Sequence, residues 1–364
     1  MIDVSILKSD ERAILTLRSI YKQYGYLPYK MSKFEEYDFY IKNKDFLLSD
    51  RIITFNDTNG KLLALKPDVT LSIIKNADDK PGSKHKVYYN ENVYRASGSV
   101  GQYKEIMQTG VECVGDIGIY DIYEAIMLAA KSLEAIGEDF ALDISELDIL
   151  GEALELASTD GVFKKEAIKC IKEKNAHDLL KLCTKYSVHA EETDRLVAYA
   201  SICGRLTEVI PQLEKYAGKK SLAAISELKT LAALLGEKYS EKITFDFSVI
   251  NDLDYYSGVV FRGFIDGIPD SVLAGGRYDK LLSKMGKRGA AIGFAIYLDK
   301  IENIGKRSDF DVDILLLCDD NTAPDKIAAE VATYTEKGKS VSVQKCIPER
   351  LRYRELINLG GDKK

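Results

Sequence analysis

The stretch that best indicates the fold is Gln102-Tyr-Lys-Glu-Ile-Met-Gln-Thr-Gly-Val-Glu-Cys-Val114, which reads as a β-strand with a polar face. Successive side chains of a strand point to opposite sides of a sheet, so Gln108, Gly110 and Glu112 share one face. A glycine inside a strand costs stability and often marks the close approach of a ligand. The amide and the carboxylate therefore flank a gap that could receive a small polar molecule. A solvated sheet face with a bulge is the alternative.

Further strands are expected next to this one. Residues 86–96 have strand character, and a loop with two glycines at 97–101 separates them from Gln102. Residues 51–56 and 61–65 flank Asp57-Thr-Asn-Gly60, which predicts a hairpin because Asn-Gly supplies the left-handed backbone of tight turns. The first hundred residues after the N-terminal helix are therefore expected to be rich in β-structure.

Helices are expected around and between these strands. They cover residues 9–24, 119–136, 278–285 and 293–304, with Gly25 ending the first. Residues from about 150 to 240 are rich in Ala, Leu, Lys and Glu, which predicts several short helices inserted into the β-rich domain. Strand character returns at 243–250 and 258–265.

Two domains are expected. The first covers residues 1–309, including the helical insertion, and ends in the polar linker 307–309. The second, residues 310–364, reads as a strand, a helix over 325–336, a strand and a short final helix. This second part is a small α/β module.

Composition limits the function classes. The 364 residues are 46% hydrophobic and 30% charged, which is typical of a soluble globular protein. No apolar run reaches the roughly 18 residues of a membrane helix, and Met1–Val4 does not begin a secretory signal, so a cytoplasmic location is expected. Six cysteines and three histidines show no metal-ligand spacing, so no metal or cofactor is expected. The net charge of −6 does not support a large nucleic-acid footprint.

Polar residues that could bind a ligand recur in two other places. In Leu65-Lys-Pro-Asp-Val-Thr70, Asp68 and Thr70 could accept hydrogen bonds from an ammonium group. Asp68 also suits the N-cap of a following helix, and both roles can hold together. Arg95 could clamp a carboxylate or phosphate with its planar guanidinium, or form a surface ion pair.

Two later segments are weaker signals by themselves. Asn251-Asp-Leu-Asp-Tyr-Tyr256 places two tyrosines before a strand, where they could form an aromatic wall or pack ordinarily. Leu273-Ala-Gly-Gly-Arg-Tyr-Asp279 puts two glycines where a helix is expected to open, so a ligand could approach the backbone closely.

The order of these segments resembles the histidyl-tRNA synthetases from about residue 5 to residue 305. The resemblance rests on Leu-Lys-Pro-Asp-x-Thr, Tyr-Arg with Gln-x-Gly-x-Glu, Leu-Asp-Tyr-Tyr, Ala-Gly-Gly-Arg-Tyr-Asp and Gly-Phe-Ala. It implies an α+β class II aminoacyl-tRNA synthetase fold, with an antiparallel sheet of six or seven strands, flanking helices and a helical insertion. It also implies a homodimer through the N-terminal helix and the segment after Gly25.

The same resemblance implies a histidine pocket. Asp68, where the family usually has Glu, would bind the α-ammonium group of histidine with Thr70 and Gln108. Arg95 would face the carboxylate, Glu112 and Tyr256 would contact the imidazole, and Tyr255 would help to form the wall.

This chain departs from the synthetase pattern at positions tied to ATP. Gln102 stands where the family has an arginine that contacts ATP phosphates, and Asn251 replaces its special catalytic arginine. Lys300 replaces an arginine that helps to hold ATP, and Tyr297 replaces a small residue beside the ATP site. Residues 310–364 resemble only the first part of the family's anticodon-binding module, so specific tRNA reading is not expected.

A pocket for histidine without ATP chemistry resembles the regulatory subunits of ATP phosphoribosyltransferase. Such a subunit has no activity of its own. It pairs with a short-form catalytic subunit for the first step of histidine biosynthesis and binds L-histidine for feedback inhibition. A divergent histidine–tRNA ligase and a tRNA-binding synthetase paralogue are the alternatives.

Overall fold

The computed structural model describes residues 7–44, 47, 52–78, 80–97, 102–250, 255–301 and 310–360. The chain separates into two compact units, Met1–Glu302 and Asn303–Lys364. Each unit is described by itself.

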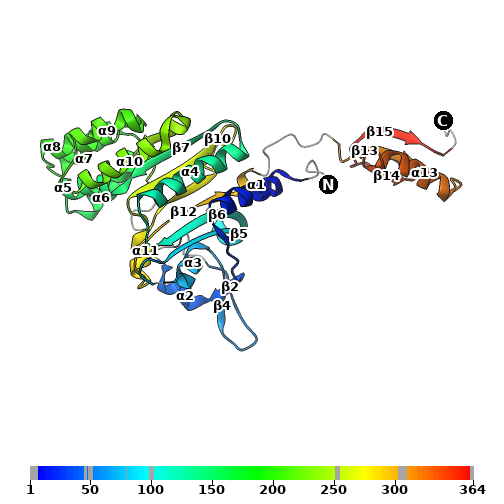
Figure 1. Ribbon diagram of the computed structural model, residues 1–364, viewed down its shortest axis with the longest axis horizontal. Helices are drawn as coiled ribbons and strands as arrows, with labels where there is room; N and C mark the ends of the chain where they lie inside the picture. Colours follow the sequence, from blue (N-terminus) through cyan, green and yellow to red (C-terminus); the bar gives the residue numbers. More distant parts are fainter. Residues whose placement is uncertain are drawn as a thin grey trace. The chain divides into compact units, whose positions relative to one another are not determined.

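The first unit is built on a nine-stranded sheet, counted over the described residues, with the order β1-β5-β6-β12-β11-β10-β7-β9-β8 (Figure 1). The strands are β1 (Leu27–Pro28), β5 (Lys84–Ser97), β6 (Gln102–Gly115), β12 (Ala290–Tyr297), β11 (Leu273–Arg277), β10 (Val259–Ile265), β7 (Phe140–Glu146), β9 (Ile243–Asp246) and β8 (Cys203–Arg205). The pairs β1–β5 and β7–β9 are parallel, and the other described pairs are antiparallel. The expected α+β sheet is confirmed, but six or seven strands was too few because the short edge strands β1 and β8 carry little sequence signal.

The long hairpin of β5 and β6 lies near one edge of this sheet. Its register runs from Lys84 opposite Gly115 to Ser97 opposite Gln102. The strands expected at 86–96 and 102–114 are therefore confirmed, with two or fewer residues added at each end.

Two long helices cover one face of the sheet. α1 (Ser9–Gln23) and α4 (Ile119–Ile136) lie against each other, and the hydroxyls of Tyr21 and Ser132 are 3.1 Å apart in a buried hydrogen bond (Figure 1). Tyr21 also packs edge-on against Phe294 of β12, with ring centroids 6.1 Å apart. Burial of this apolar layer fixes the orientation of the central strands.

A smaller layer lies on the opposite face. It contains α2 (Tyr37–Lys42), α3 (Thr70–Asn76), α11 (Asp279–Lys284) and the three-stranded sheet of β2 (Phe34–Glu36), β3 (Thr54–Asn56) and β4 (Leu62–Leu65), counted over the described residues. Buried apolar residues of α3 and α11, including Leu71, Ile74 and Leu281, share one cluster with Tyr89 of β5. The predicted β3–β4 hairpin is confirmed, and Asp57 accepts hydrogen bonds from the amides of Asn59 and Lys61, both at 2.8 Å.

The inserted region is helical, as expected, except for β8. Its helices are α5 (Leu147–Ala157), α6 (Gly161–Lys172), α7 (Ala176–Lys185), α8 (Ala190–Tyr199), α9 (Leu206–Lys215) and α10 (Ser221–Ser240). The buried carboxylate of Glu152 in α5 accepts hydrogen bonds from the amides of Lys220 (2.8 Å) and Ser221 (2.7 Å). This contact supplies acceptors for otherwise unpaired amides at the start of α10.

The helix predicted over 278–285 is confirmed as α11 (Asp279–Lys284), whereas the helix predicted over 293–304 is wrong for most of its described length. Of this range, residues 293–297 end β12 and residues 298–301 form the short α12 (Leu298–Ile301), while residues 302–304 lie outside the described residues. β12 lies between β6 and β11 and is buried on both faces, so its continuous apolar run could not be distinguished from a buried helix by periodicity. Gly275 and Gly276 lie in β11 and do not open a helix; α11 begins at Asp279.

The second unit is a three-stranded parallel sheet, within the described residues, with one helix. It contains β13 (Val312–Leu317), α13 (Pro324–Thr335), β14 (Val341–Gln344) and β15 (Tyr353–Asn358), in the strand order β14-β13-β15. The short final helix expected here is wrong, because the last segment pairs with β13 as β15. Tertiary pairing decides this segment, and the ion pair of Arg352 with Asp311 at 2.8 Å lies beside its start.

Candidate functional site

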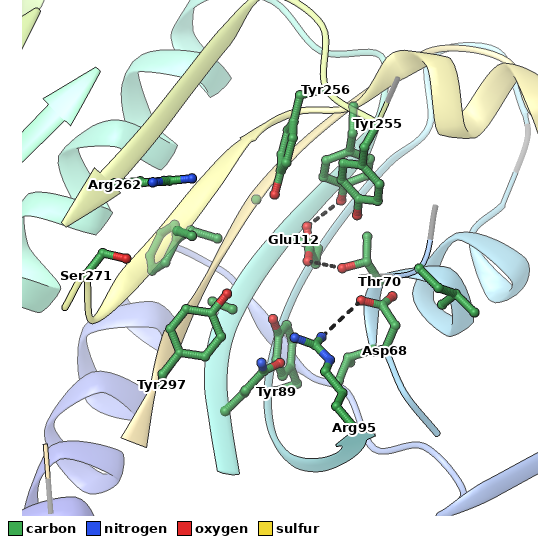
Figure 2. Close-up of a pocket in the computed structure, with 18 of the residues that line it drawn as sticks. Asp68, Thr70, Tyr89, Arg95, Glu112, Tyr255, Tyr256, Arg262, Ser271 and Tyr297 are labelled. Carbon is green, nitrogen blue, oxygen red and sulfur yellow. Dashed lines mark hydrogen bonds and ion pairs between the residues drawn. The ribbon is translucent and has the colours of Figure 1, made fainter. Parts of the chain in front are cut away.

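A cavity of about 380 Å³ lies on the sheet face opposite α1 and α4 (Figure 2). The seven residues expected to bind a ligand all line it: Asp68, Thr70, Arg95, Gln108, Glu112, Tyr255 and Tyr256. Gln108 and Glu112 come from β6, as the alternation predicted, and both are almost fully buried. The alternative of a solvated sheet face is therefore wrong for this strand.

Glu112 forms the most buried polar centre of the cavity. Its side chain is 2% exposed and accepts a hydrogen bond from the Thr70 hydroxyl at 2.9 Å and another from the Tyr278 hydroxyl. Burial raises the pKa of Glu112 to about 8, although both hydroxyl donors oppose that rise. Gly293 lies opposite in β12, where an added Cβ would be 1.7 Å from Glu112 Oε2. Only glycine leaves space for this carboxylate.

Asp68 caps α3, which is one of the two roles that the sequence left open, and it also lines the cavity. One oxygen accepts a hydrogen bond from the Leu71 amide at 2.9 Å and caps α3, while the other lies 3.7 Å from Arg95 Nη2. Burial raises the pKa of Asp68, and the Arg95 charge opposes this effect. Arg95 Nε also donates to the Pro67 carbonyl at 2.7 Å, so the guanidinium is held in the cavity wall rather than at the surface.

Tyrosines form the wall beside Glu112. The ring centroids of Tyr255 and Tyr256 are 4.5 Å apart, and Tyr255 lies 5.9 Å from Tyr278. Figure 2 shows the Tyr256 hydroxyl pointing into the cavity. Tyr255 also packs against the core cluster, so wall and packing roles hold together. Gly276 admits the Tyr256 ring, because an added Cβ there would be 2.8 Å from Tyr256 Cδ1.

The gap expected above Gly110 is not open to a ligand. An added Cβ at Gly110 would lie 2.8 Å from the Tyr89 hydroxyl and 2.1 Å from the Phe294 carbonyl oxygen. Tyr89, directly opposite Gly110 in the hairpin, takes that space and itself lines the cavity. The glycine therefore positions a wall residue, which corrects the sequence-based interpretation.

The other end of the cavity is basic, and we call it the basic end; it is formed by Arg262, Ser271, Tyr297 and Lys300. Lys300 Nζ donates to the Ser271 carbonyl at 2.9 Å and lies 5.3 Å from the centre of the Tyr297 ring. The end formed by Asp68, Thr70 and Glu112 is called the carboxylate end.

The three positions expected to have lost ATP-binding groups lie in different places. Lys300 lines the cavity, whereas Gln102 is exposed at the start of β6, opposite Ser97. Asn251 lies outside the described residues. The sequence did not identify Tyr89, Arg262, Ser271 or Tyr278 as cavity residues. Tyr89 could have been predicted, because the register of the β5–β6 hairpin places it directly opposite Gly110.

The described ranges hold neither a cluster of metal ligands nor a membrane-spanning helix. Across these residues no group of three or more His, Cys, Asp or Glu side chains could hold a metal ion. In the same part of the chain no helix is long and apolar enough to cross a membrane.

Comparison with known proteins gives the class of this chain. A family model described as histidyl-tRNA synthetase matches residues 7–301, so the chain belongs to the histidyl-tRNA synthetase family. The ATP phosphoribosyltransferase regulatory subunit of Caldanaerobacter subterraneus subsp. tengcongensis is 30% identical over 293 residues, which are 78% of this chain and 75% of that protein. Within the family, the chain groups with the regulatory subunits of ATP phosphoribosyltransferase.

Solved structures show the same fold. An ATP phosphoribosyltransferase regulatory subunit/histidyl-tRNA synthetase from Bacillus halodurans has a TM-score of 0.75 and 22% identity, covering 98% of this chain and 95% of that one. A chain of the ATP phosphoribosyl transferase (HisG:HisZ) complex from Thermotoga maritima has a TM-score of 0.62 and 20% identity, covering 79% of this chain and 97% of that one. The expected class II synthetase-like fold is confirmed.

Proposed function

We propose that this chain is a regulatory subunit of ATP phosphoribosyltransferase that has no activity of its own and binds free L-histidine in its cavity as the feedback signal. The observation that carries the proposal is the buried Glu112 carboxylate, held by Thr70 and Tyr278 in a cavity that also contains Asp68 and Arg95. The regulatory-subunit relatives support the assignment to this system.

The carboxylate end matches the groups of histidine. An imidazole N–H would donate to Glu112, with Tyr256 alongside, and the α-ammonium group would lie near Asp68, Thr70 and Gln108. Arg95 would meet the α-carboxylate. A buried site of this kind discriminates strongly, because a ligand that lacks a matching group leaves a buried partner without a hydrogen bond.

The basic end offers little support for adenylate chemistry. Adenylation develops charge on phosphates and needs cations aimed at it, and loss of one such donor typically costs about 2.7–4 kcal/mol. Lys300 lacks the planar fork of arginine, and its ammonium already donates to the Ser271 carbonyl. Tyr297 adds a ring to the same part of the cavity. The function of a divergent histidine–tRNA ligase is therefore less well supported than that of a regulatory subunit.

The proposed partner is a short-form ATP phosphoribosyltransferase catalytic subunit in the cytoplasm. The Thermotoga maritima structure, by its description, is a complex of such a transferase, which supports a hetero-oligomer here. A homodimer within that assembly would use α1 and the segment after Gly25, where Leu15 and Leu27 are 50% and 68% exposed. Histidine would regulate only if it binds one assembly state more tightly than another.

The first experiment uses the full chain alone. Histidine-dependent exchange of labelled pyrophosphate into ATP is measured beside calorimetric titration with histidine. We expect no exchange and a clear binding isotherm. Robust exchange would show that this chain adenylates histidine, and the function would then be that of a divergent histidine–tRNA ligase. Salt-dependent tRNA binding without either signal would favour the tRNA-binding paralogue.

The second experiment tests the regulatory role. The chain is mixed with a short-form ATP phosphoribosyltransferase, and activity is followed with and without histidine. We expect the chain to activate the transferase and histidine to inhibit the mixture. The Glu112→Gln variant should retain activation and respond to histidine only at higher concentration. Equal histidine sensitivity of both mixtures would reject the cavity as the sensor.

A further inference from the structure

A lysine is buried beside the carboxylate end of the cavity. Lys66 is 1% exposed, and its ammonium forms an ion pair with the Glu91 carboxylate of β5, whose side chain is 13% exposed. Neither side chain is among those that line the cavity. A buried ion pair often contributes little to stability, because the cost of desolvating both charges offsets their attraction. The place of this pair in the fold is therefore more informative than its strength.

The pair lies on the segment that carries Asp68. Residues 66–68 connect β4 to α3. The Lys66 amide donates to the Lys33 carbonyl at 3.0 Å, and the Lys66 carbonyl accepts from the Tyr94 amide at 2.9 Å. The backbone of this segment is therefore held between the start of β2 and β5, and the ion pair adds a side-chain tie to β5.

The other groups expected to bind the amino acid adjoin the same pair. Arg95 Nε donates to the Pro67 carbonyl at 2.7 Å, and Arg95 Nη2 lies 3.7 Å from Asp68. Glu91 and Arg95 share one face of β5, because they are four residues apart in a strand. On β6, Gln108 lies directly opposite Glu91. The pair therefore adjoins three of the side chains that would meet the α-ammonium and α-carboxylate groups.

We propose that the Lys66–Glu91 ion pair has a positioning role: it sets the separation of the two charges that would meet the α-ammonium and α-carboxylate groups of a bound amino acid. Because the pair ties the segment to β5 two residues before Asp68, its loss lets the segment turn about its backbone hydrogen bonds. The distance from Asp68 to Arg95 then changes. The inference rests on the proposed function, which assigns the α-groups of histidine to this end of the cavity.

The contact with the imidazole ring gives an internal reference. Glu112 accepts hydrogen bonds from the Thr70 and Tyr278 hydroxyls, and neither bond involves Lys66 or Glu91. Imidazole itself has the ring of histidine without the α-groups. A shift of the groups that meet the α-ammonium and α-carboxylate should therefore weaken histidine binding and leave imidazole binding unaffected.

The test uses the full chain with the double substitution Lys66→Met and Glu91→Leu. Removal of one partner alone would leave the other charge buried and destabilise the fold, whereas an apolar pair of similar volume is usually tolerated. Calorimetry with L-histidine and ligand-observed NMR with imidazole are performed on the wild type and the variant, and thermal unfolding checks that both are folded. We expect histidine affinity to fall about tenfold or more and imidazole affinity to stay the same.

A matched control is the exposed ion pair of Lys61 and Glu36. It joins the β3–β4 turn to β2 at 2.9 Å, and its side chains are 64% and 63% exposed. The same double substitution there, Lys61→Met with Glu36→Leu, should leave both affinities unchanged, because neither residue borders the cavity.

Two results would overturn the inference and leave the proposed function standing. Wild-type histidine affinity in the Lys66→Met and Glu91→Leu variant would show that the pair does not position the groups that meet the ligand. An equal loss of affinity for histidine and imidazole would show that the pair supports the cavity as a whole. Absence of histidine binding by the wild type would instead reject the proposed function, and the inference with it.

Discussion

The two ends of the cavity are built in different ways. At the carboxylate end, both Glu112 oxygens accept hydrogen bonds from fixed hydroxyls, and Asp68 is held by a helix amide and by Arg95. At the basic end, the floor is made of alanines, and long side chains approach from the edges. A site with buried, fixed partners selects one ligand, whereas a site with long side chains over a bare floor adapts more readily.

The largest expected effect comes from removing the space that Glu112 needs. Gly293→Ala should lower the free energy of unfolding by about 1–3 kcal/mol and abolish histidine binding, because the new Cβ overlaps the Glu112 carboxylate. Urea unfolding and calorimetry measure the two effects. Gly151→Ala in α5 is the matched control, because nothing lies within 4 Å of its added Cβ. It should be neutral or stabilising by up to about 1 kcal/mol.

Glu112→Gln tests the carboxylate end without changing its shape. The amide removes one of the two carboxyl oxygens that could accept the imidazole N–H and cannot lose a proton, so histidine binding should weaken by about 1–3 kcal/mol in calorimetry. The same substitution at Glu105, which is exposed on the same strand, should leave the affinity unchanged. Wild-type affinity in Glu112→Gln would mean that the imidazole does not meet this carboxylate.

The pH dependence of stability gives a separate check on Glu112. Its pKa rises from the ordinary value of 4.5 to about 8 in the folded chain, so between these pH values the unfolded chain loses this proton and the folded chain retains it. Stability is therefore lost as the pH rises through this window. Glu112→Gln removes the effect, so its stability relative to the wild type should increase by at least about 1 kcal/mol from pH 5 to pH 8. A difference that stays constant with pH would contradict the burial argument.

The smallest expected effect lies at the basic end. Lys300→Gln should change histidine affinity by less than about 0.5 kcal/mol, since the Lys300 ammonium bonds the Ser271 carbonyl and lies away from Glu112. Calorimetry under the conditions used for Glu112→Gln makes the two values comparable. A loss as large as that of Glu112→Gln would show that the two ends do not act separately.

The sequence predicted those strands and turns whose local residue pattern is characteristic by itself. Alternation along 102–114 placed Gln108 and Glu112 on one face, and the Asn-Gly turn predicted the β3–β4 hairpin. β12 was missed because a strand buried on both faces has no polar alternation, and β15 because its place depends on pairing with β13.

Some of the cavity residues were predicted from the sequence and others were not, for a related reason. Asp68, Thr70 and Glu112 belong to a recognisable series of motifs, so resemblance assigned them to one site. Arg262 reaches the cavity only because β10 is aligned with β11 and β12, and strand order is not contained in any single segment. Tyr278 similarly contacts Glu112 across 166 residues of sequence.

Asp68 has a consequence beyond ligand contact. One oxygen caps the first turn of α3 and the other faces Arg95, so a single carboxylate joins the cavity to a helix whose Leu71 and Ile74 are fully buried. An ammonium group that attracted Asp68 into the cavity would alter the hydrogen bond between Asp68 and the Leu71 amide. The cavity wall and the start of α3 therefore depend on the same carboxylate.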